Sequence, residues 1–288
     1  RWLSDWSSDV CSSDLTPVLL SASIIDILDP EIINGITYQN DGDVRNTRVK
    51  FYDVNTMTDI SGWLTPGLVT PGDATRGIVT FTWNVPVPTS GYNTFTIGVM
   101  IEGAGYYVGG PAQSVLNVYR TTLNEFITGG GHIIPMDSKG EYASDPGKKV
   151  NFGYNVKWNK SLTNLQGNLN LIFRRGGQVY QIKSTATNSL SINTLNPCSQ
   201  QATFTSKANL TNVTNSALPV SVYGGLSLSV TMTDNGEPGM SDMIGFTLYN
   251  GSTLIYSSSW PVNKTVELPL VGGNNVVHNG TICNASTA

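Results

Sequence analysis

The chain has 288 residues, a formal net charge of −4 and a charged fraction of only 12%, about half of the ~25% usual in soluble domains. Its length is enough for two ordinary domains or one large β domain. The weak negative charge, with no basic stripe, argues against nucleic acid as a partner, and the lack of any run of 18 apolar residues argues against a membrane span. The abundance of Thr, Ser, Asn and Gly suggests an extracellular all-β protein.

Residues 1–15 do not look like the start of a folded domain. They combine Trp2, Trp6 and Cys11 with five serines and three aspartates, and they show neither strand alternation nor a helical stripe. No basic segment precedes an apolar core, so they are not a signal peptide. The stretch resembles a translated sequencing-adaptor remnant of the kind found on metagenomic fragments, and we expect the native sequence to begin near Thr16. A disordered, tag-like terminus is the alternative.

Beyond residue 15 the dominant hydrophobic period is two, as in strands that bury one face. Alternating runs cover 79–83, 94–101, 150–158, 169–173, 226–233 and 244–248. Turn signals separate the runs, and those at 175–177 and 250–251 have the composition of hairpin tips. Many short strands with regularly spaced turns are typical of sandwiches. The fold class we predict is all-β, with two tandem antiparallel β-sandwiches.

Composition also divides the chain into modules. We expect a first β-sandwich at 16–120, a Gly-rich linker at 121–131, a second sandwich at 132–277 and a tail at 278–288. The linker assignment depends on the triple glycine 129–131, which has neither the phosphate-loop pattern nor a following helix. We interpret His132, directly after the glycines, as part of a hinge rather than a ligand.

Three segments of the second half carry a family resemblance. They are the opening FITGGGHI at 126–133, the strand VNFGYNVKW at 150–158, and the loop DNGEPGMSD at 234–242 with the strand that follows it. Together they look like the post-COAP-type β-sandwich that follows Ig-like repeats in large bacterial surface proteins, although His132 and the cysteine-bearing segment 196–201 depart from that pattern. More loosely, 16–120 is similar to bacterial Ig-like repeats, through 49–53, 83–86 and the strand ending at 118–120.

The resemblance implies a non-catalytic structural or adhesive module that is secreted or displayed at the cell surface. Its expected partners are other domains of the same polypeptide and surface glycans or proteins. A carbohydrate-binding accessory module of a secreted enzyme is the alternative, because the aromatics Tyr106, Tyr107, Trp63 and Trp260 occur in Gly- or Ser-flanked segments. A third hypothesis makes the chain itself a hydrolase.

The richest candidate site is the loop 234–242. Asp234, Asn235, Glu237 and Asp242 can all present oxygen atoms, and Ca²⁺ takes six to eight oxygen ligands. The spacing is not that of an EF-hand loop. An ordinary turn, in which Asp and Asn bind their own backbone, is the alternative.

Two cysteines remain once Cys11 is discounted. Cys198 and Cys283 lie near Asn, Ser and Pro residues that suggest loops, and in an extracellular chain they could pair. The alternative is two free thiols, since their spacing fits no zinc motif.

Evidence for catalysis in the sequence is weak. Acidic residues gather at Asp41 and Asp43, and again at Asp137, Glu141 and Asp145, but nothing holds a carboxylate pair about 5–9 Å apart, as glycosidases require. The only histidines are His132 and His278, and no serine lies in a Gly-x-Ser-x-Gly elbow. We therefore expect no catalytic residues and no enzyme.

Overall fold

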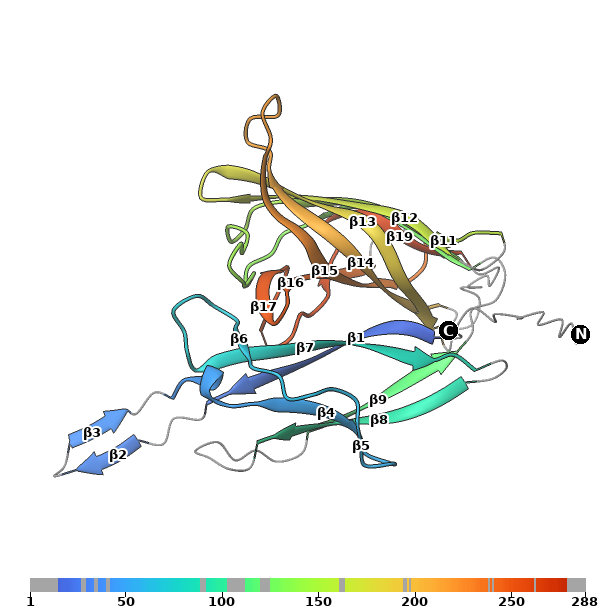
Figure 1. The fold of residues 1–288 in the computed structure, drawn as a ribbon. Helices are drawn as coiled ribbons and strands as arrows, with labels where there is room; N and C mark the ends of the chain where they lie inside the picture. Colours follow the sequence, from blue (N-terminus) through green and yellow to red (C-terminus); the bar gives the residue numbers. More distant parts are fainter. Residues whose placement is uncertain are drawn as a thin grey trace, which may run out of the picture.

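The computed structural model describes residues 15–26, 30–33, 36–39, 42–88, 92–102, 112–119, 125–160, 164–193, 196, 198–237, 239, 241–261 and 263–278. These residues form two modules of antiparallel strands that pack against each other (Figure 1). In the described part of the chain the one helical element is the short 3-10 turn η1 (Val44–Asn46), which confirms the all-β class. None of the helices in those residues is long and apolar enough to cross a membrane.

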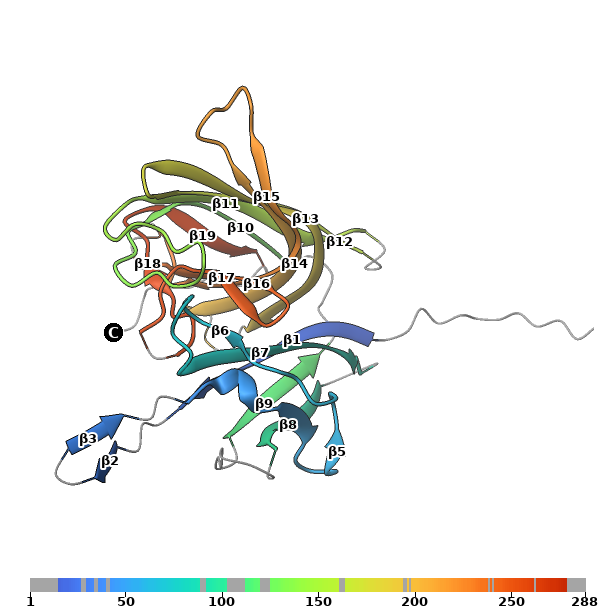
Figure 2. The ribbon, with the colours of Figure 1, turned by 60° about the vertical axis from the view of Figure 1, so that its left-hand side comes forward.

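The first module consists of two sheets that enclose a small core. One sheet has the order β1 (Leu15–Ile25), β7 (Arg76–Pro86), β6 (Gly67–Leu68), and the other has the order β5 (Thr58–Asp59), β4 (Val49–Asp53), β8 (Tyr92–Ile101), β9 (Ala112–Tyr119). Alternate residues of both sheets meet in one apolar cluster, which includes Ile24 and Val79 from the first sheet and Phe51 and Ile97 from the second. The short hairpin of β2 (Pro30–Ile33) and β3 (Ile36–Gln39) projects away from both sheets (Figures 1 and 2).

The second module is one antiparallel sheet of ten strands. Its strands are β10 (Phe126–Ile133), β11 (Val150–Trp158), β12 (Leu165–Arg175), β13 (Gln178–Asn193), β14 (Gln200–Asn212), β15 (Val220–Asp234), β16 (Met243–Asn250), β17 (Thr253–Ser257), β18 (Leu268–Pro269) and β19 (Gly272–His278). The order is β17-β16-β15-β14-β13-β12-β11-β10-β19, and β18 pairs with β16 beside this path.

This sheet curls around its own core, as Figure 2 shows. The alternation read from the sequence turns one face of every long strand inward, and inner residues such as Phe204, Val230 and Phe246 are fully buried in a single cluster. The central strands β13, β14 and β15 have 16, 13 and 15 residues. Two register shifts interrupt each of the β13–β14 and β14–β15 ladders, and such bulges bend strands and increase their twist.

The single curled sheet does not confirm the two-sheet sandwich expected for 132–277. In a sandwich, two sheets pack face to face and each buries one of its faces. In a curled sheet, a single sheet bends around and buries its own inner face. Both arrangements produce the same two-residue alternation along a strand. The sequence pattern alone cannot separate them, because bulges and long-range contacts determine how the sheet bends.

Two predicted hairpin tips are confirmed. Gly176 and Gly177 connect β12 to β13 across the pair Arg175–Gln178, and both have positive φ, 56° and 77°. Such values belong to the type I′ turn, whose twist matches that of the flanking strands. Gly251, with φ 55°, begins the turn between β16 and β17.

The triple glycine is not a linker. Gly129, Gly130 and Gly131 lie inside β10, which pairs with β11 on one side and β19 on the other. A Cβ at Gly129 would lie 2.5 Å from the Asn275 side chain, and one at Gly131 would lie 2.2 Å from the Gly272 carbonyl oxygen. These glycines allow close approach between neighbouring groups. The adjacent His132, expected in a hinge, is part of the same strand, and the expected tail at 278–288 overlaps β19 by His278.

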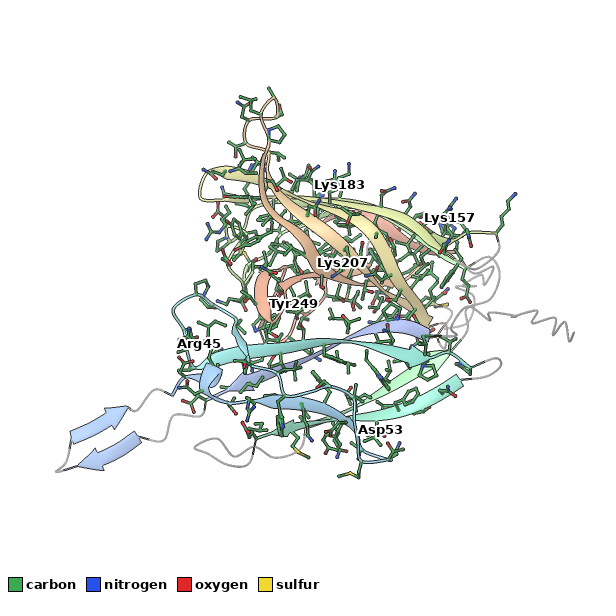
Figure 3. The ribbon with its side chains drawn as sticks, in the orientation of Figure 1. Arg45, Asp53, Lys157, Lys183, Lys207 and Tyr249 are labelled. Carbon is green, nitrogen blue, oxygen red and sulfur yellow. The ribbon has the colours of Figure 1, made fainter. Side chains whose placement is uncertain are left out.

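The two modules share a packed interface. Alternate residues of β1 and β7 point away from the first core and meet the outside of the curled sheet, where Ile78 joins Tyr249, Leu254 and Trp260 in a buried apolar cluster. The Thr80 hydroxyl donates a hydrogen bond to the Gly251 carbonyl at 2.7 Å. The β1–β7–β6 sheet is therefore covered on both faces, and Tyr249 lies between the modules in Figure 3.

Candidate functional site

The loop 234–242 holds the last strand of the curled sheet in place. Asp234 ends β15, and its Oδ2 accepts a hydrogen bond from the Val277 amide at 2.8 Å. Asp242 precedes β16, and its Oδ2 accepts one from the Asn275 amide at 2.7 Å. Both amides belong to β19, whose other edge pairs with β10. Two carboxylates thus bridge β19 to the β15–β16 connection, and we call this arrangement the carboxylate clasp.

The remaining oxygens of the clasp accept bonds from their own loop. Asp242 Oδ1 accepts a hydrogen bond from the Asn235 amide at 2.9 Å, and Asp234 Oδ1 accepts one from the Gly236 amide at 2.8 Å. Asp242 is fully buried. Burial raises its pKa above the ordinary range, while the hydrogen bonds from the Asn275 and Asn235 amides act in the opposite direction.

A buried polar pair supports the clasp from inside the sheet. Asn275 is fully buried; its Nδ2 donates to the Met243 carbonyl at 3.0 Å and its Oδ1 accepts from the Tyr154 hydroxyl at 2.9 Å. Burial raises the pKa of Tyr154 well above its usual range, and the nearby carboxylates Asp242 and Asp234 raise it further. The sequence had no signal for Asn275, because asparagine is common throughout this chain and here lies within a strand.

The four residues expected to bind Ca²⁺ do converge on one region. Glu237 accepts hydrogen bonds from Asn274 Nδ2 at 2.9 and 3.0 Å, and Asn235 uses its side chain to donate to the Ser241 carbonyl. The oxygens of Asp234 and Asp242 accept from amides, as a structural loop requires. No group of three or more His, Cys, Asp or Glu residues suited to a metal occurs in the described ranges, and Ca²⁺ binding here stays an untested prediction.

A groove of about 620 Å³ lies between the two modules. Its floor is the outer face of β15 and β16, with Ser229, Thr231 and Thr247, and its opposite wall is β1, with Ser21 and Ser23. The segment from Asn263 to Glu267 closes one side. Hydroxyl groups line much of these walls, together with the charged Lys264 and Glu267, so the groove is suited to a polar ligand.

Glu267 is a partly buried acid of this groove. Its Oε1 and Oε2 accept hydrogen bonds from the Thr233 hydroxyl at 3.0 and 3.1 Å, and Oε2 accepts one from Gln201 Nε2 at 2.9 Å. Burial raises its pKa, and these hydrogen bonds act in the opposite direction. Glu267 was not recognised from the sequence, where it is an isolated acid in a Pro- and Val-rich segment.

Cys198 is disulfide-bonded, and its partner lies outside the described residues, as do Cys11 and Cys283. The neighbouring Ser199 hydroxyl donates to Asn235 Oδ1 at 2.7 Å, which places Cys198 near the clasp and so near the end of β19. Cys283 follows His278 by five positions, a reach of up to about 17 Å for extended chain. Pairing of Cys198 with Cys283 remains our prediction.

The other acidic candidates that the structure describes bind partners within the protein. Asp43 is the N-cap of η1 and pairs with Arg45 at 2.6 Å, while Asp41 lies outside the described residues. Asp137 pairs with Lys139 at 3.3 Å. Glu141 accepts from the Tyr223 hydroxyl at 2.9 Å, and Asp145 accepts from the Gly176 amide at 3.0 Å. Each of these described carboxylates thus has its own local partner.

The two histidines lie at opposite ends of the β10–β19 pair. His132 is opposite Gly272, and His278 is opposite Phe126. The His278 ring stacks on Phe126 with a centroid distance of 4.0 Å, and its Nε2 lies 3.0 Å from the Thr128 hydroxyl. The geometry gives His278 a packing role at the strand end.

The candidate stacking aromatics do not gather on one face of the described chain. Trp63 is 39% exposed, with Lys50 Nζ 5.0 Å from the centroid of its ring. Trp260 is 5% exposed and belongs to the interface between modules. Tyr106 and Tyr107 lie outside the described residues.

The fold and these sites define an all-β protein of two packed modules. Comparison of the chain with models of protein families, with curated proteins and with solved structures finds no match.

Proposed function

We propose that the chain is a non-catalytic structural or adhesive part of a large extracellular or cell-surface bacterial protein, built from an Ig-like module and a post-COAP-type module. The packed interface between the modules is the observation that carries this proposal. Ile78 and Tyr249 are buried between the modules, so the pair can act as one stiff unit. A stiff unit that transmits force or holds a binding surface away from its anchor requires such a contact.

The use of the carboxylates supports a structural role. Asp234 and Asp242 bind backbone amides of β19, and Glu267 binds Thr233 and Gln201. An acid or base in hydrolysis needs a carboxylate directed at substrate, whereas these carboxylates are directed at the protein itself. This observation favours the structural proposal over the hydrolase hypothesis.

The carbohydrate-binding accessory module remains the second candidate, favoured by the hydroxyl-lined groove. Its weakness is the position of the aromatics, since Trp260 is buried at the interface and Trp63 lies on the first module. A stacking platform needs aromatic faces open to solvent on one surface. The structural or adhesive proposal is therefore better supported.

Recovery of the reading frame that flanks the coding region for 16–288 tests the proposed function. We expect an export signal and further β-modules in that frame. An adjacent catalytic domain would transfer the proposal to the accessory-module alternative. A complete short frame for a cytosolic protein would overturn both.

The stiffness of the two-module unit can be tested with glycine variants. A Cβ at Gly67 would lie 2.1 Å from the Ser252 carbonyl oxygen across the interface, so Gly67→Ala should weaken the contact by about 1–3 kcal/mol. Gly62→Ala is the matched control, because no atom lies within 4 Å of its added Cβ. Small-angle scattering should report one compact particle for wild type and Gly62→Ala and a broader distribution for Gly67→Ala. Independent modules already in wild type would contradict the proposal.

A further inference from the structure

Charge is distributed unevenly in the second module. Between Asp145 and Asp234 the chain has no Asp or Glu, although it has eight Lys and Arg residues in that interval. This interval contains all of β11, β12, β13 and β14, which are consecutive neighbours in the sheet. A protein with net charge −4 thus has four adjacent strands without a single acid.

Three lysines lie on the outer face of these strands. Lys157 is on β11, Lys183 on β13 and Lys207 on β14, and all three are exposed. Figure 3 labels all three on the curled sheet, with Lys183 and Lys157 along its upper side and Lys207 lower, on β14. The ion pairs found among the described residues do not include any of them. Their charges are therefore available to a ligand.

The pairing register fixes the spacing of these charges. Lys183 is opposite Asn209, two residues beyond Lys207, so their Cα atoms are about 8 Å apart for ordinary strand spacing. Lys183 is also opposite Asn170 in β12, and Lys157 is opposite Gln166 in the same strand. Four residues along β12 and two strand spacings separate Lys183 from Lys157 by about 17 Å.

Amide side chains occupy the surface between the lysines. The exposed outward positions of β11, β12 and β14 include Asn151, Asn155, Gln166, Asn168, Asn170 and Asn209. Gln181 Nε2 donates to Asn170 Oδ1 at 2.8 Å, and the backbone N–H of Asn168 donates to Asn155 Oδ1 at 3.1 Å. These bonds hold the side-chain amides of Gln181, Asn170 and Asn155 in place. Amides donate to and accept from hydroxyl and carboxylate groups alike.

We propose that this outer face of β11–β14, the lysine–amide face, binds an acidic polysaccharide. The inference rests on the proposed adhesive function and names its ligand class. Separated lysines complement carboxylates that occur at intervals along a sugar chain, and the amides between them can bind the intervening hydroxyl groups. The face is convex, so it is suited to a long polymer lying across several strands rather than to a small molecule that needs a pocket.

Nucleic acid fits this face less well. Double-stranded DNA has one charge for about every 1.7 Å of its axis, far denser than lysines about 8–17 Å apart. Single strands are bound through aromatic residues on which bases stack. The described outer positions of β11–β14 carry mainly amides, lysines and hydroxyls, with Ile172, Arg174 and Val179 among them. The aromatics Phe152, Tyr154 and Phe204 of these strands belong to the core instead.

The test compares polygalacturonate with its carboxyl-reduced form, which keeps the sugar chain and loses the charge. Wild-type protein should bind the charged polymer at low salt, and its affinity should fall as the salt concentration rises. The triple variant Lys157→Gln, Lys183→Gln, Lys207→Gln should weaken this binding about tenfold, because three exposed ion pairs each contribute a factor of about two to three. Glutamine at exposed positions among amides should leave the thermal unfolding temperature unchanged.

A control variant has the same change in net charge. Lys148, Lys149 and Lys160 are exposed but lie in the connections before and after β11, and their replacement by Gln should change binding less than about threefold. A gain-of-function variant, Asn168→Lys, adds a charge at an exposed position inside the face and should strengthen binding about twofold.

Four outcomes would overturn the proposal. They are equal loss in both triple variants, equal binding of the reduced polymer, tighter binding of single-stranded DNA than of polygalacturonate, and no binding to any polymer. Each would leave the proposed structural role standing if the flanking frame still encodes an exported multidomain protein. A flanking frame that encodes a cytosolic protein would instead overturn the proposed function, whatever the polymer-binding experiments show.

Discussion

The two modules use the same kind of strand but enclose their cores in different ways. The first places two short sheets face to face, so that Phe51 and Val79 from opposite sheets meet. In the second module one long sheet curls so that β19 comes to lie near β15. Asp234 and Asp242 hold β19 there by accepting hydrogen bonds from its backbone amides. Side chains, rather than a strand ladder, complete this second enclosure.

The difference shows what local pattern can and cannot determine. Alternation selects the face of a strand that is buried, and it does so equally well in both modules. The layout depends on strand length, on bulges that bend the ladders, and on polar groups that meet across long sequence distances. A sheet edge must be covered or paired in some way, and the clasp is how the second module covers the edge of β19.

The largest expected effect separates the two cores. Phe51→Ala and Phe204→Ala each remove a fully or almost fully buried ring and should cost about 3–5 kcal/mol of the free energy of unfolding. Because the rings belong to different clusters, hydrogen exchange should show lost protection in 42–102 for the first variant and in 126–278 for the second. Equal loss in both regions from either variant would show one cooperative unit instead of two.

Much of this fold could be predicted from the sequence. The runs at 79–83, 150–158 and 226–233 lie in strands, and the hairpin tips at Gly176-Gly177 and Gly251 are confirmed. The glycines 129–131 could not be interpreted correctly, because a glycine that permits close strand approach and a glycine in a linker look alike in sequence. What distinguishes them is Asn275 and Gly272, which lie more than a hundred residues away.

The next effect concerns the clasp. Asp242→Asn keeps the shape of the side chain but replaces one carboxylate oxygen, which accepts a hydrogen bond, with an NH₂ group, which can only donate. That NH₂ group then faces the backbone N–H of either Asn275 or Asn235, which also donates. Loss of a hydrogen bond to a charged group should cost about 1.5–3 kcal/mol, and the amides of Asn275 and Val277 should exchange faster while β11 and β12 remain protected. Glu237→Gln is the control, because Glu237 is exposed and binds only the Asn274 side chain among the described residues. Unchanged exchange at Asn275 in Asp242→Asn would refute the closing role of the clasp.

The candidate site was only partly predictable for the same reason. Asp234, Asn235, Glu237 and Asp242 were recognised as an oxygen-rich loop, and they do act together. Their partners are backbone amides of β19, and a backbone amide leaves no mark on sequence composition. The sequence therefore cannot separate an acidic loop that binds a metal ion from one whose carboxylates accept hydrogen bonds from main-chain amides.

The smallest expected effect is a difference in pH dependence between the modules. Burial raises the folded-state pKa of Asp242 and Glu267 in the second module. The folded form therefore binds protons more tightly than the unfolded form, and this module should gain stability as pH falls from 7 through those pKa values.

In the first module, hydrogen bonds from Arg45 and Arg48 lower the pKa of Asp43 and Glu102. Their contribution is present at neutral pH and is lost as pH falls below about 4; both groups are solvent-exposed, so it should be small and weakened by salt. Urea unfolding followed by hydrogen exchange in each module between pH 7 and 3 should show opposite slopes, and Glu267→Gln should flatten only that of the second module. Parallel slopes would mean that Asp242 and Glu267 remain ionised without cost, and both carboxylates would then have to be better hydrated than their geometry indicates.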